Sequence, residues 1–253
     1  MLTRKSLIVG GQYGILFVRE GEVHESSQRE NYEKKSRGNS RKECRKVFGQ
    51  SPGANYSLLP GSITHFSKVI DEADIIVMQA EIPYETIKKI ALSAKKKGKK
   101  VLFNPAPACL IDEELMKAID ILVVNELEAS FISGIDYTDN NLEEIAETLL
   151  KAGTSNVVIT LGSQGAYMKN AKETIQLPGC KVNAIDTIAA GDTFCGALAV
   201  VCAKKEIDRE ALNFANTAAA IAVTRSGAQP SIPTLDEVKH FMLEKELALS
   251  FNF

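Results

Sequence analysis

The chain has 253 residues, of which 45% are hydrophobic and 25% charged, and its formal net charge is −2. This length suits one sizeable domain or two small ones, which can bury a core without a metal or disulfide staple. The near-neutral charge gives no general attraction to nucleic acids or membranes, and no apolar run reaches transmembrane length. Five cysteines without a Cys-x-x-Cys pair are typical of a reducing compartment, so we expect a cytoplasmic protein.

The N-terminal part divides into a strand-like stretch and a polar stretch. Residues 6–18 hold two short apolar runs separated by Gly10-Gly11, which predicts two strands joined by a tight turn. Residues 19–50 are rich in Arg, Lys, Glu, Ser and Asn and include a basic cluster. Such a cluster is compatible with a nucleic-acid patch, but a solvated or disordered segment is its more usual meaning, and we expect the latter.

From Pro52 onward, apolar runs and amphipathic stretches alternate. The run at residues 75–78 is continuous, as in a parallel strand covered on both faces. Further strands are predicted at 100–103, 121–124 and 157–160, and a hairpin at 166–168 and 174–177. Helices are predicted at 84–97, 112–119, 141–152, 190–204, 209–225 and 235–247. This alternation predicts an α/β fold with right-handed βαβ units and a parallel sheet.

Polar residues follow each of these predicted strands. In chain order they are Gln79 and Glu81, then Asn104, then Asn125 and Glu128, and finally Thr160, Gly162, Ser163 and Gly165. Ligands on parallel sheets bind at the carboxyl ends of the strands. Four such ends in register therefore indicate one shared crevice.

The segment Asp186–Phe194, with the sequence DTIAAGDTF, carries the strongest chemical signal. Gly191 permits close approach of the backbone to a ligand, and the exposed N–H groups of a starting helix attract anions. Asp192 lies in that positive field, where a carboxylate can take a proton from a hydroxyl. An isolated Asp there is usually a helix cap, but a cap alone needs no run of small residues. The combination is typical of phosphoryl transfer.

Together these segments resemble the ribokinase branch of the PfkB family of carbohydrate kinases, from Pro52 to about Leu243. The matching motifs, besides Asp186–Phe194, are Pro52–Asn55, Glu81–Pro83, Asn104–Ala108, Asn125–Glu128, Thr160–Gly165 and Val223–Ser231. The resemblance implies a three-layer α/β/α sandwich with a mostly parallel central sheet, formed by residues 51–253. It also implies transfer of the ATP γ-phosphate to the 5-hydroxyl of ribose.

The resemblance assigns roles to individual residues. Asp192 is the expected catalytic base, and the N–H groups of Ala189, Ala190 and Gly191 form the expected anion hole. The expected nucleotide site consists of Thr160, Leu161, Gly162, Ser163, Gln164 and Gly165, with Asn216 on the adenine side. By itself, Asn216 is equally well explained as an ordinary polar residue on a helix face.

Two metal sites follow from the same resemblance. Asn125 and Glu128 share one helix face and are expected to organise phosphate and magnesium-bound water. Helix capping is the alternative, plausible for Asn125 and weaker for Glu128. A potassium site is expected from Asp186, Ile188, Ala222, Arg225, Gly227 and Ser231. Four of these residues would donate only backbone carbonyls.

Residues 1–50 depart from the family pattern. The positions of the Asn-x-Asp pair that grips the sugar hydroxyls fall at Tyr13 and Ile15, and Ile cannot accept a hydrogen bond. Residues 19–50 contain no counterpart of the Gly-Gly-Lys-Gly-Ala-Asn sugar motif. Of the expected sugar contacts in the matched region, Glu81 is retained. The lid sheet is therefore expected to be reduced or missing, which also leaves open the homodimer that the family forms through it.

Two explanations stand for this N-terminal segment. It is either the remnant of a frameshift or internal deletion, or a divergent lid, and the abrupt change in composition near Gln50-Ser51 favours the first. The corresponding functions are a ribose kinase with impaired activity or a non-catalytic nucleotide-binding pseudokinase. Another sugar or nucleoside kinase of the PfkB family is a further alternative.

Overall fold

The computed structural model describes residues 5–9, 15–19, 22–25, 53–245 and 247 of the chain. Its strands are β1 (Lys5–Val9), β2 (Ile15–Arg19), β3 (Glu22–Glu25), β4 (Ile75–Gln79), β5 (Lys100–Asn104), β6 (Ile121–Asn125), β7 (Asn156–Thr160), β8 (Ala166–Asn170) and β9 (Thr174–Leu177). They form one nine-stranded sheet in the order β3-β2-β1-β4-β5-β6-β7-β8-β9. The five central strands β1, β4, β5, β6 and β7 run parallel to one another. The pairs β2–β3 and β8–β9 extend the two edges in antiparallel pairing.

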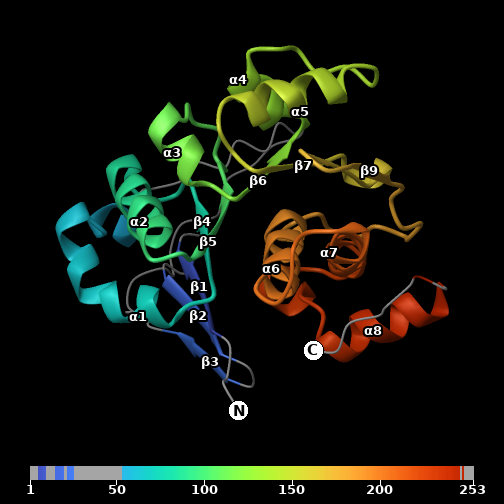
Figure 1. The fold of residues 1–253 in the computed structure, drawn as a ribbon. Helices are drawn as coiled ribbons and strands as arrows, with labels where there is room; N and C mark the ends of the chain where they lie inside the picture. The colour runs from blue at the N-terminus through green and yellow to red at the C-terminus, as the bar shows by residue number, and fades with distance from the viewer. Residues whose placement is uncertain (1–4, 10–14, 20–21, 26–52, 246, 248–253) are drawn as a thin grey trace, which may run out of the picture.

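Helices cover both faces of this sheet, as Figure 1 shows. The first face carries α1 (Ser67–Glu72), α2 (Tyr84–Lys96), α3 (Glu113–Ala118), α4 (Glu126–Ser133) and α5 (Leu142–Lys151). The second carries α6 (Ala190–Cys202), α7 (Arg209–Ala222) and α8 (Leu235–Glu244). Short 3-10 turns complete the described chain: η1 (Gly53–Ser57), η2 (Pro60–Phe66), η3 (Gly162–Gln164) and η4 (Gln229–Ser231). The expected three-layer α/β/α arrangement is confirmed.

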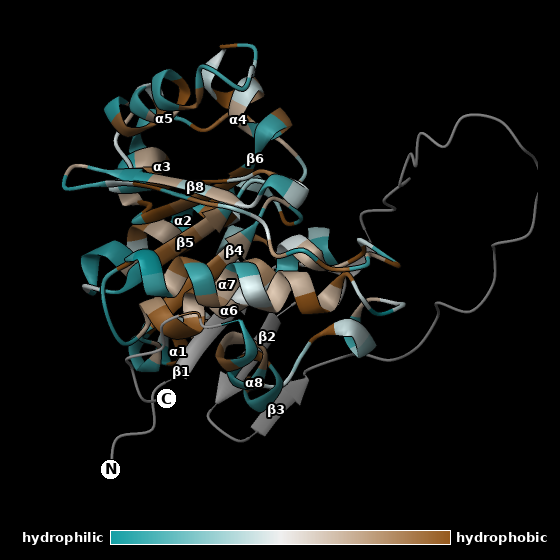
Figure 2. Cartoon of the chain, turned by 90° about the vertical axis from the view of Figure 1, so that its right-hand side faces the viewer, coloured by the Kyte–Doolittle hydropathy of each residue, from teal (hydrophilic) through white to brown (hydrophobic). Residues whose placement is uncertain are grey.

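The alternation of side chains along each strand explains the two hydrophobic cores. In β4, Ile76 and Met78 pack under the α1–α5 layer, whereas Ile75 and Val77 pack under the α6–α8 layer. Successive side chains of a strand point to opposite faces, so a strand covered on both sides must be apolar throughout. Figure 2 shows brown, hydrophobic stretches along the central strands and teal, hydrophilic stretches on the outer helices.

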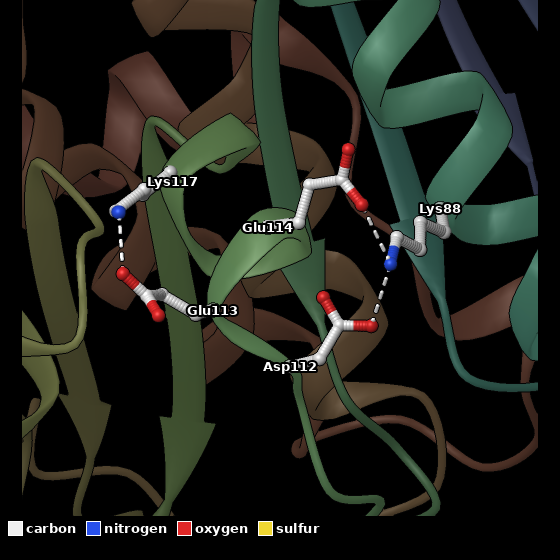
Figure 3. A pocket seen from close by; sticks show the side chains of 5 residues that line it. All are labelled: Lys88, Asp112, Glu113, Glu114 and Lys117. Atoms are coloured by element: carbon white, nitrogen blue, oxygen red, sulfur yellow. Dashed lines mark hydrogen bonds and ion pairs between the residues drawn. The ribbon is translucent and has the colours of Figure 1, made fainter.

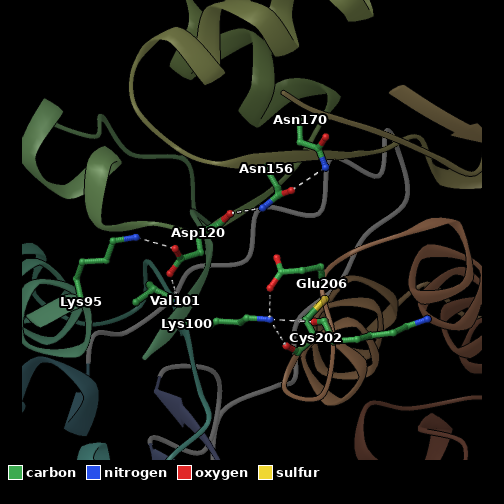
Figure 4. A network of polar contacts seen from close by, with 9 residues as sticks. Lys95, Lys100, Val101, Asp120, Asn156, Asn170, Cys202 and Glu206 are labelled. Atoms are coloured by element: carbon green, nitrogen blue, oxygen red, sulfur yellow. Dashed lines mark hydrogen bonds and ion pairs between the residues drawn. The ribbon is translucent and has the colours of Figure 1, made fainter. Parts of the chain in front are cut away.

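A polar network closes the edge of the sheet where the parallel strands begin (Figure 4). Lys100, the first residue of β5, donates from Nζ to the carbonyls of Cys202 at 3.0 Å and Lys205 at 2.9 Å. This cation satisfies the carbonyl of Cys202, the last residue of α6, where the helix end carries partial negative charge, and the carbonyl of Lys205 in the turn that follows. The end of α6 is thus fixed at the start of β5, and the beginning of α6 lies at the opposite edge, where the parallel strands end.

Most predicted elements between residues 75 and 247 are confirmed to within a few residues. The two strands predicted within residues 6–18 form β1 and β2, and β1 pairs in parallel with β4. The turns and short helix between residues 53 and 72 were not predicted, because the stretch shows no clear periodicity. Among the described residues, no helix is long and apolar enough to cross a membrane.

One expectation for the N-terminal part was wrong. Glu22–Glu25 lies in the segment predicted to be solvated or disordered, but it forms β3, antiparallel to β2. A four-residue edge strand needs only backbone pairing to a neighbour, which composition does not reveal. In the described part of the chain, β2 and β3 continue the main sheet, and no separate lid sheet is seen. Tyr13 and residues 26–52 lie outside the described residues, so the division at residue 50 stays a prediction.

Candidate active site

Asp192 lies in the first turn of α6, exposed at the edge where the parallel strands end. Its Oδ1 accepts a hydrogen bond of 2.6 Å from Nε2 of Gln79, the last residue of β4. The same Nε2 lies 3.3 Å from Oδ1 of Asn104, the last residue of β5. Asn104 in turn donates from Nδ2 to the carbonyl of Val123 at 2.9 Å. The carboxylate is thus joined to two strand ends and open to solvent, which suits a proton acceptor.

The chain enters α6 through an unusual backbone conformation. Ala189 has φ 61° and ψ 9°, the left-handed region that non-glycine residues seldom occupy. That conformation costs about 1–2 kcal/mol in an L-residue. Such local strain is often found at functional sites. Gly191 is exposed, and a Cβ placed on it would meet no atom within 4 Å. Packing therefore does not require this glycine, whereas close approach of a ligand would.

The amides at this helix start lack acceptors within the helix. The first N–H groups of an α-helix have no acceptor inside the helix, and those of Gly191 and Asp192 belong to this set. The N–H of Ala190 makes only a long contact of 3.4 Å to the carbonyl of Thr187. The predicted anion-hole residues Ala189, Ala190 and Gly191 therefore share one helix start with Asp192, where Gly191 and Asp192 are exposed.

The predicted nucleotide loop lies directly after β7. Leu161 is buried and donates from its N–H to the carbonyl of Gly165 at 2.8 Å, which closes the loop. Gly162, Ser163 and Gln164 form the η3 turn, with Ser163 and Gln164 exposed. The side chain of Thr160 stays on the strand, with Oγ1 3.4 Å from the carbonyl of Val124.

Two glycines hold this loop against the segment that follows β9. A Cβ on Gly165 would lie 2.1 Å from the carbonyl oxygen of Leu177, and a Cβ on Gly179 would lie 2.1 Å from that of Ser163. The two backbones are therefore in direct contact, which only glycine permits. Sequence reasoning identified Gly165 but missed Gly179, although a Pro-Gly pair after a strand is a recognised turn signal.

Asn216 of α7 reaches the same segment from the other side. It is buried, and its Nδ2 donates to the carbonyl of Pro178 at 3.0 Å. The structure thus brings Asn216 and the predicted nucleotide loop together through residues 177–180. This hydrogen bond fixes a loop that borders the predicted nucleotide site, and the place of Asn216 on the adenine side stays a prediction.

Asn125 and Glu128 form a reciprocal capping box at the start of α4. Asn125 Oδ1 accepts from the N–H of Glu128 at 2.8 Å, and Glu128 Oε2 accepts from the N–H of Asn125 at 2.9 Å. The view that capping was the weaker explanation for Glu128 was therefore wrong. Burial raises the pKa of Glu128 above its ordinary value. The cap occupies one carboxylate oxygen, so the expected role near magnesium would rest on the other.

The structure also tests whether Glu128 fits magnesium. Within the described residues, no group of three or more His, Cys, Asp or Glu side chains lies close enough together to hold a metal. Magnesium keeps most of its water shell and needs only one or two carboxylates. A single carboxylate such as that of Glu128 is therefore chemically sufficient for the hydrated magnesium ion that the resemblance predicts.

The six residues of the expected potassium site come from two segments that hydrogen bonds join. Asp186 accepts from the N–H of Ile188 at 3.0 Å and from the N–H of Gly227 at 3.1 Å. Ser231 is fully buried and donates to the carbonyl of Ala228 at 2.6 Å. The remaining members, Ala222 and Arg225, lie at the end of α7 and just after it.

The side chain of Arg225 is engaged with another element. Its guanidinium pairs with Glu237 of α8, at 2.6 Å between Nη2 and Oε1. A contribution of Arg225 to a potassium site would therefore have to come from its backbone carbonyl, and the site itself stays a prediction. Carbonyl, hydroxyl and carboxylate oxygens are the ligands that hard cations prefer.

A separate surface pocket between α2 and α3 contains none of the predicted site residues (Figure 3). Lys88 bridges Asp112 at 2.9 Å and Glu114 at 2.8 Å, and Glu113 pairs with Lys117. These neighbouring carboxylates raise the pKa of Lys88 above its ordinary value. Both lysines are paired with these carboxylates, so we interpret the pocket as a contact between two helices.

Comparison with known proteins identifies relatives over most of this chain. The sequence matches the family described as pfkB family carbohydrate kinase over residues 37–235. It is 40% identical to a ribokinase of Staphylococcus aureus over 76% of this chain and 63% of the relative. It is 31% identical to a deoxyribokinase of Salmonella typhi over 75% of this chain and 62% of the relative. The chain thus spans a little over three fifths of the length of these curated relatives.

Solved structures agree with the sequence relatives. The ribokinase of Thermotoga maritima is similar with a TM-score of 0.69 and 40% identity, over 76% of this chain and 64% of that one. The ribokinase of Arabidopsis thaliana, solved with ribose and ATP, has a TM-score of 0.67 and 31% identity, over 74% of this chain and 59% of that one. The matched sequence, the three-layer fold and the Asp192 helix start all lead to one conclusion: the chain belongs to the pfkB family of carbohydrate kinases.

Proposed function

We propose that this chain is an ATP-dependent sugar kinase of the ribokinase type, which transfers the γ-phosphoryl group of ATP to the 5-hydroxyl of ribose. The observation that carries the proposal is the exposed carboxylate of Asp192, placed at a helix start and hydrogen-bonded by Gln79 at 2.6 Å. A base at this point can take the proton of a sugar hydroxyl as the oxygen attacks phosphorus.

Each neighbouring element has a part in this proposal. The amides at the start of α6 stabilise the negative charge that develops on the transferred group. The loop from Thr160 to Gly165 and the segment held by Asn216 border the nucleotide. Glu128 would hold water of a magnesium ion, which neutralises phosphate charge when bound. The expected potassium site around Asp186 would hold the ion and keep the segment that leads into α6 in place.

Ribose and 2-deoxyribose are the two sugars that the test has to distinguish, because the relatives include both ribokinases and a deoxyribokinase. Glu81, two residues after the end of β4, is the expected sugar contact in the described chain. One observation favours a second candidate, a nucleotide-binding protein without turnover. Isoleucine stands at residue 15, where the resemblance calls for an acceptor of sugar hydrogen bonds.

The test measures ADP release by the purified chain with ATP, magnesium and potassium, in the presence of ribose, of 2-deoxyribose or of no sugar. Release that depends on sugar is expected, with a loss of about 100-fold or more in Asp192→Asn. Asp236→Asn is the matched control, because Asp236 is also exposed in the first turn of a helix. Equal ADP release with and without each sugar would refute the kinase. Thermal stabilisation by ATP without turnover would support the second candidate.

A further inference from the structure

We propose that Gln79 and Asn104 are positioning residues that orient the carboxylate of Asp192 for proton transfer. The inference rests on the proposed function of Asp192 as the base. It assigns to the ends of β4 and β5 a task distinct from binding sugar or nucleotide. Neither amide side chain transfers a proton itself.

A backbone carbonyl fixes the direction of this hydrogen-bonded chain. The carbonyl of Val123 can only accept, so Asn104 must turn its Nδ2 toward it, at 2.9 Å. That choice leaves Oδ1 of Asn104 facing Gln79. Asn104 is buried, with 9% of its surface exposed, and cannot easily turn its amide to bond water instead. The orientation of Asn104 is therefore set by the sheet itself.

The hydrogen bond to Asn104 sets the orientation of the Gln79 amide. An oxygen acceptor at 3.3 Å requires Gln79 to present Nε2 there, and the same nitrogen then donates to Asp192 Oδ1 at 2.6 Å. An amide nitrogen has two hydrogens, so one can go to each partner. Since Oδ1 of Asp192 is occupied in this way, Oδ2 is left to accept the substrate proton.

The sheet and the helix are held in register around this contact. Gln79 and Asn104 are direct partners in the β4–β5 ladder. At the other end of α6, Lys100 holds the carbonyls of Cys202 and Lys205. The helix is thus attached to the sheet at both ends, and Gln79 is the attachment next to the reacting group. A misplacement of about 1 Å can cost on the order of 100-fold in rate.

Two further titratable groups, Cys195 and Glu128, lie in the neighbourhood of Asp192. Cys195, one turn later in α6, is buried, and burial raises the pKa of its thiol, with smaller contributions from Asp192 and Glu128. Among the described residues, Gln79 donates a hydrogen bond to Asp192, whereas neither Cys195 nor Glu128 is hydrogen-bonded to it. A change at Gln79 is therefore expected to act on Asp192 most directly.

The experiment compares Gln79→Leu, Gln79→Glu and Asn104→Leu with Gln176→Leu, a control on the exposed face of β9. We expect Gln79→Leu to lower kcat by about 10- to 100-fold, with KM for ATP and sugar changed less than about threefold. Asn104→Leu should act in the same direction. In Gln79→Glu two adjacent carboxylates share a proton, so the acidic limb of the kcat profile should move up by about one pH unit or more. A purely structural role would not move that limb.

The outcomes separate this inference from the proposed function. If Asp192→Asn abolishes transfer while Gln79→Leu keeps the kcat and pH profile of the wild type, the positioning inference is overturned and the kinase assignment stands. If the wild type transfers phosphate to no sugar, the kinase assignment falls. Crystal structures of the wild type and Gln79→Leu then show whether the Asp192 carboxylate keeps its orientation. A carboxylate of Asp192 that keeps its place without Gln79 overturns the inference, and one that turns away supports it.

Folding is checked separately for each variant by circular dichroism and thermal unfolding. If Gln79→Leu does not fold, Gln79→Glu keeps the side-chain size and still tests the donor. An unchanged acidic limb in Gln79→Glu, together with an unchanged kcat, overturns the inference.

Discussion

The contact between the nucleotide loop and the segment after β9 allows a quantitative prediction for Gly165→Ala. Gly165 has φ 103° and ψ −129°, a region that residues with a Cβ avoid. The added methyl would lie 2.1 Å from Leu177 O, 2.5 Å from Pro178 C and 2.6 Å from Gly179 N. All three neighbours are backbone atoms, so no side chain can turn away to make room.

The expected cost has two parts. The backbone conformation costs about 1–3 kcal/mol in alanine. Overpacking against the 177–179 backbone adds about 1–3 kcal/mol. The reduced freedom of the unfolded chain returns about 0.4–1 kcal/mol. We therefore expect Gly165→Ala to lower the free energy of unfolding by roughly 3 kcal/mol, which corresponds to a fall in Tm of about 6–12 °C.

Gly162→Ala is the matched control in the same loop. Gly162 also has a positive φ, 53°, but a Cβ there would meet nothing within 4 Å. Its conformational cost of about 1–2 kcal/mol is largely offset by the unfolded-state gain, so a net loss of about 1 kcal/mol or less is expected. Urea unfolding monitored by circular dichroism measures both variants. The reasoning would be refuted by a Gly165→Ala loss within about 0.5 kcal/mol of the Gly162→Ala loss.

Three further predictions concern charged side chains. Lys100→Met should lower the free energy of unfolding by about 1 kcal/mol, because the end of α6 loses its cation, and a change below about 0.3 kcal/mol in urea unfolding would contradict this. Arg225 lowers the pKa of Glu237 from its ordinary 4.5 to about 2. The stabilisation by the Arg225–Glu237 ion pair is therefore complete above pH 4.5 and lost as the pH falls toward 2. Glu237→Gln should accordingly flatten the dependence of Tm on pH across that interval. Burial raises the pKa of Glu128, so the folded state loses stability as the pH rises above 4.5, and Glu128→Gln should remove that part of the slope. A Glu128→Gln curve parallel to the wild type from pH 4 to 7 would contradict the last expectation.

The strands of the parallel sheet and the polar residues at its edge were within reach of sequence reasoning, because the relevant signals are local. Ile75 to Met78 is apolar at every position, which identifies a strand covered on both faces wherever it lies in the fold. Gln79 and Asn104 then fall at strand ends because parallel strands end at one edge of a sheet. The small residues before Asp192 identify a helix start open to an anion for an equally local reason.

Only the tertiary structure decided which of these residues touch. Gln79 and Asp192 are 113 residues apart in sequence, and their hydrogen bond depends on how the α6 layer lies on the sheet. The roles of Gly179 and Asn216 in fixing the loops also became visible only in the structure, since their partners Ser163 and Pro178 lie on other elements. Periodicity and motif spacing describe a residue and its near neighbours, whereas such contacts are fixed by the packing of layers that the chain joins only at a distance.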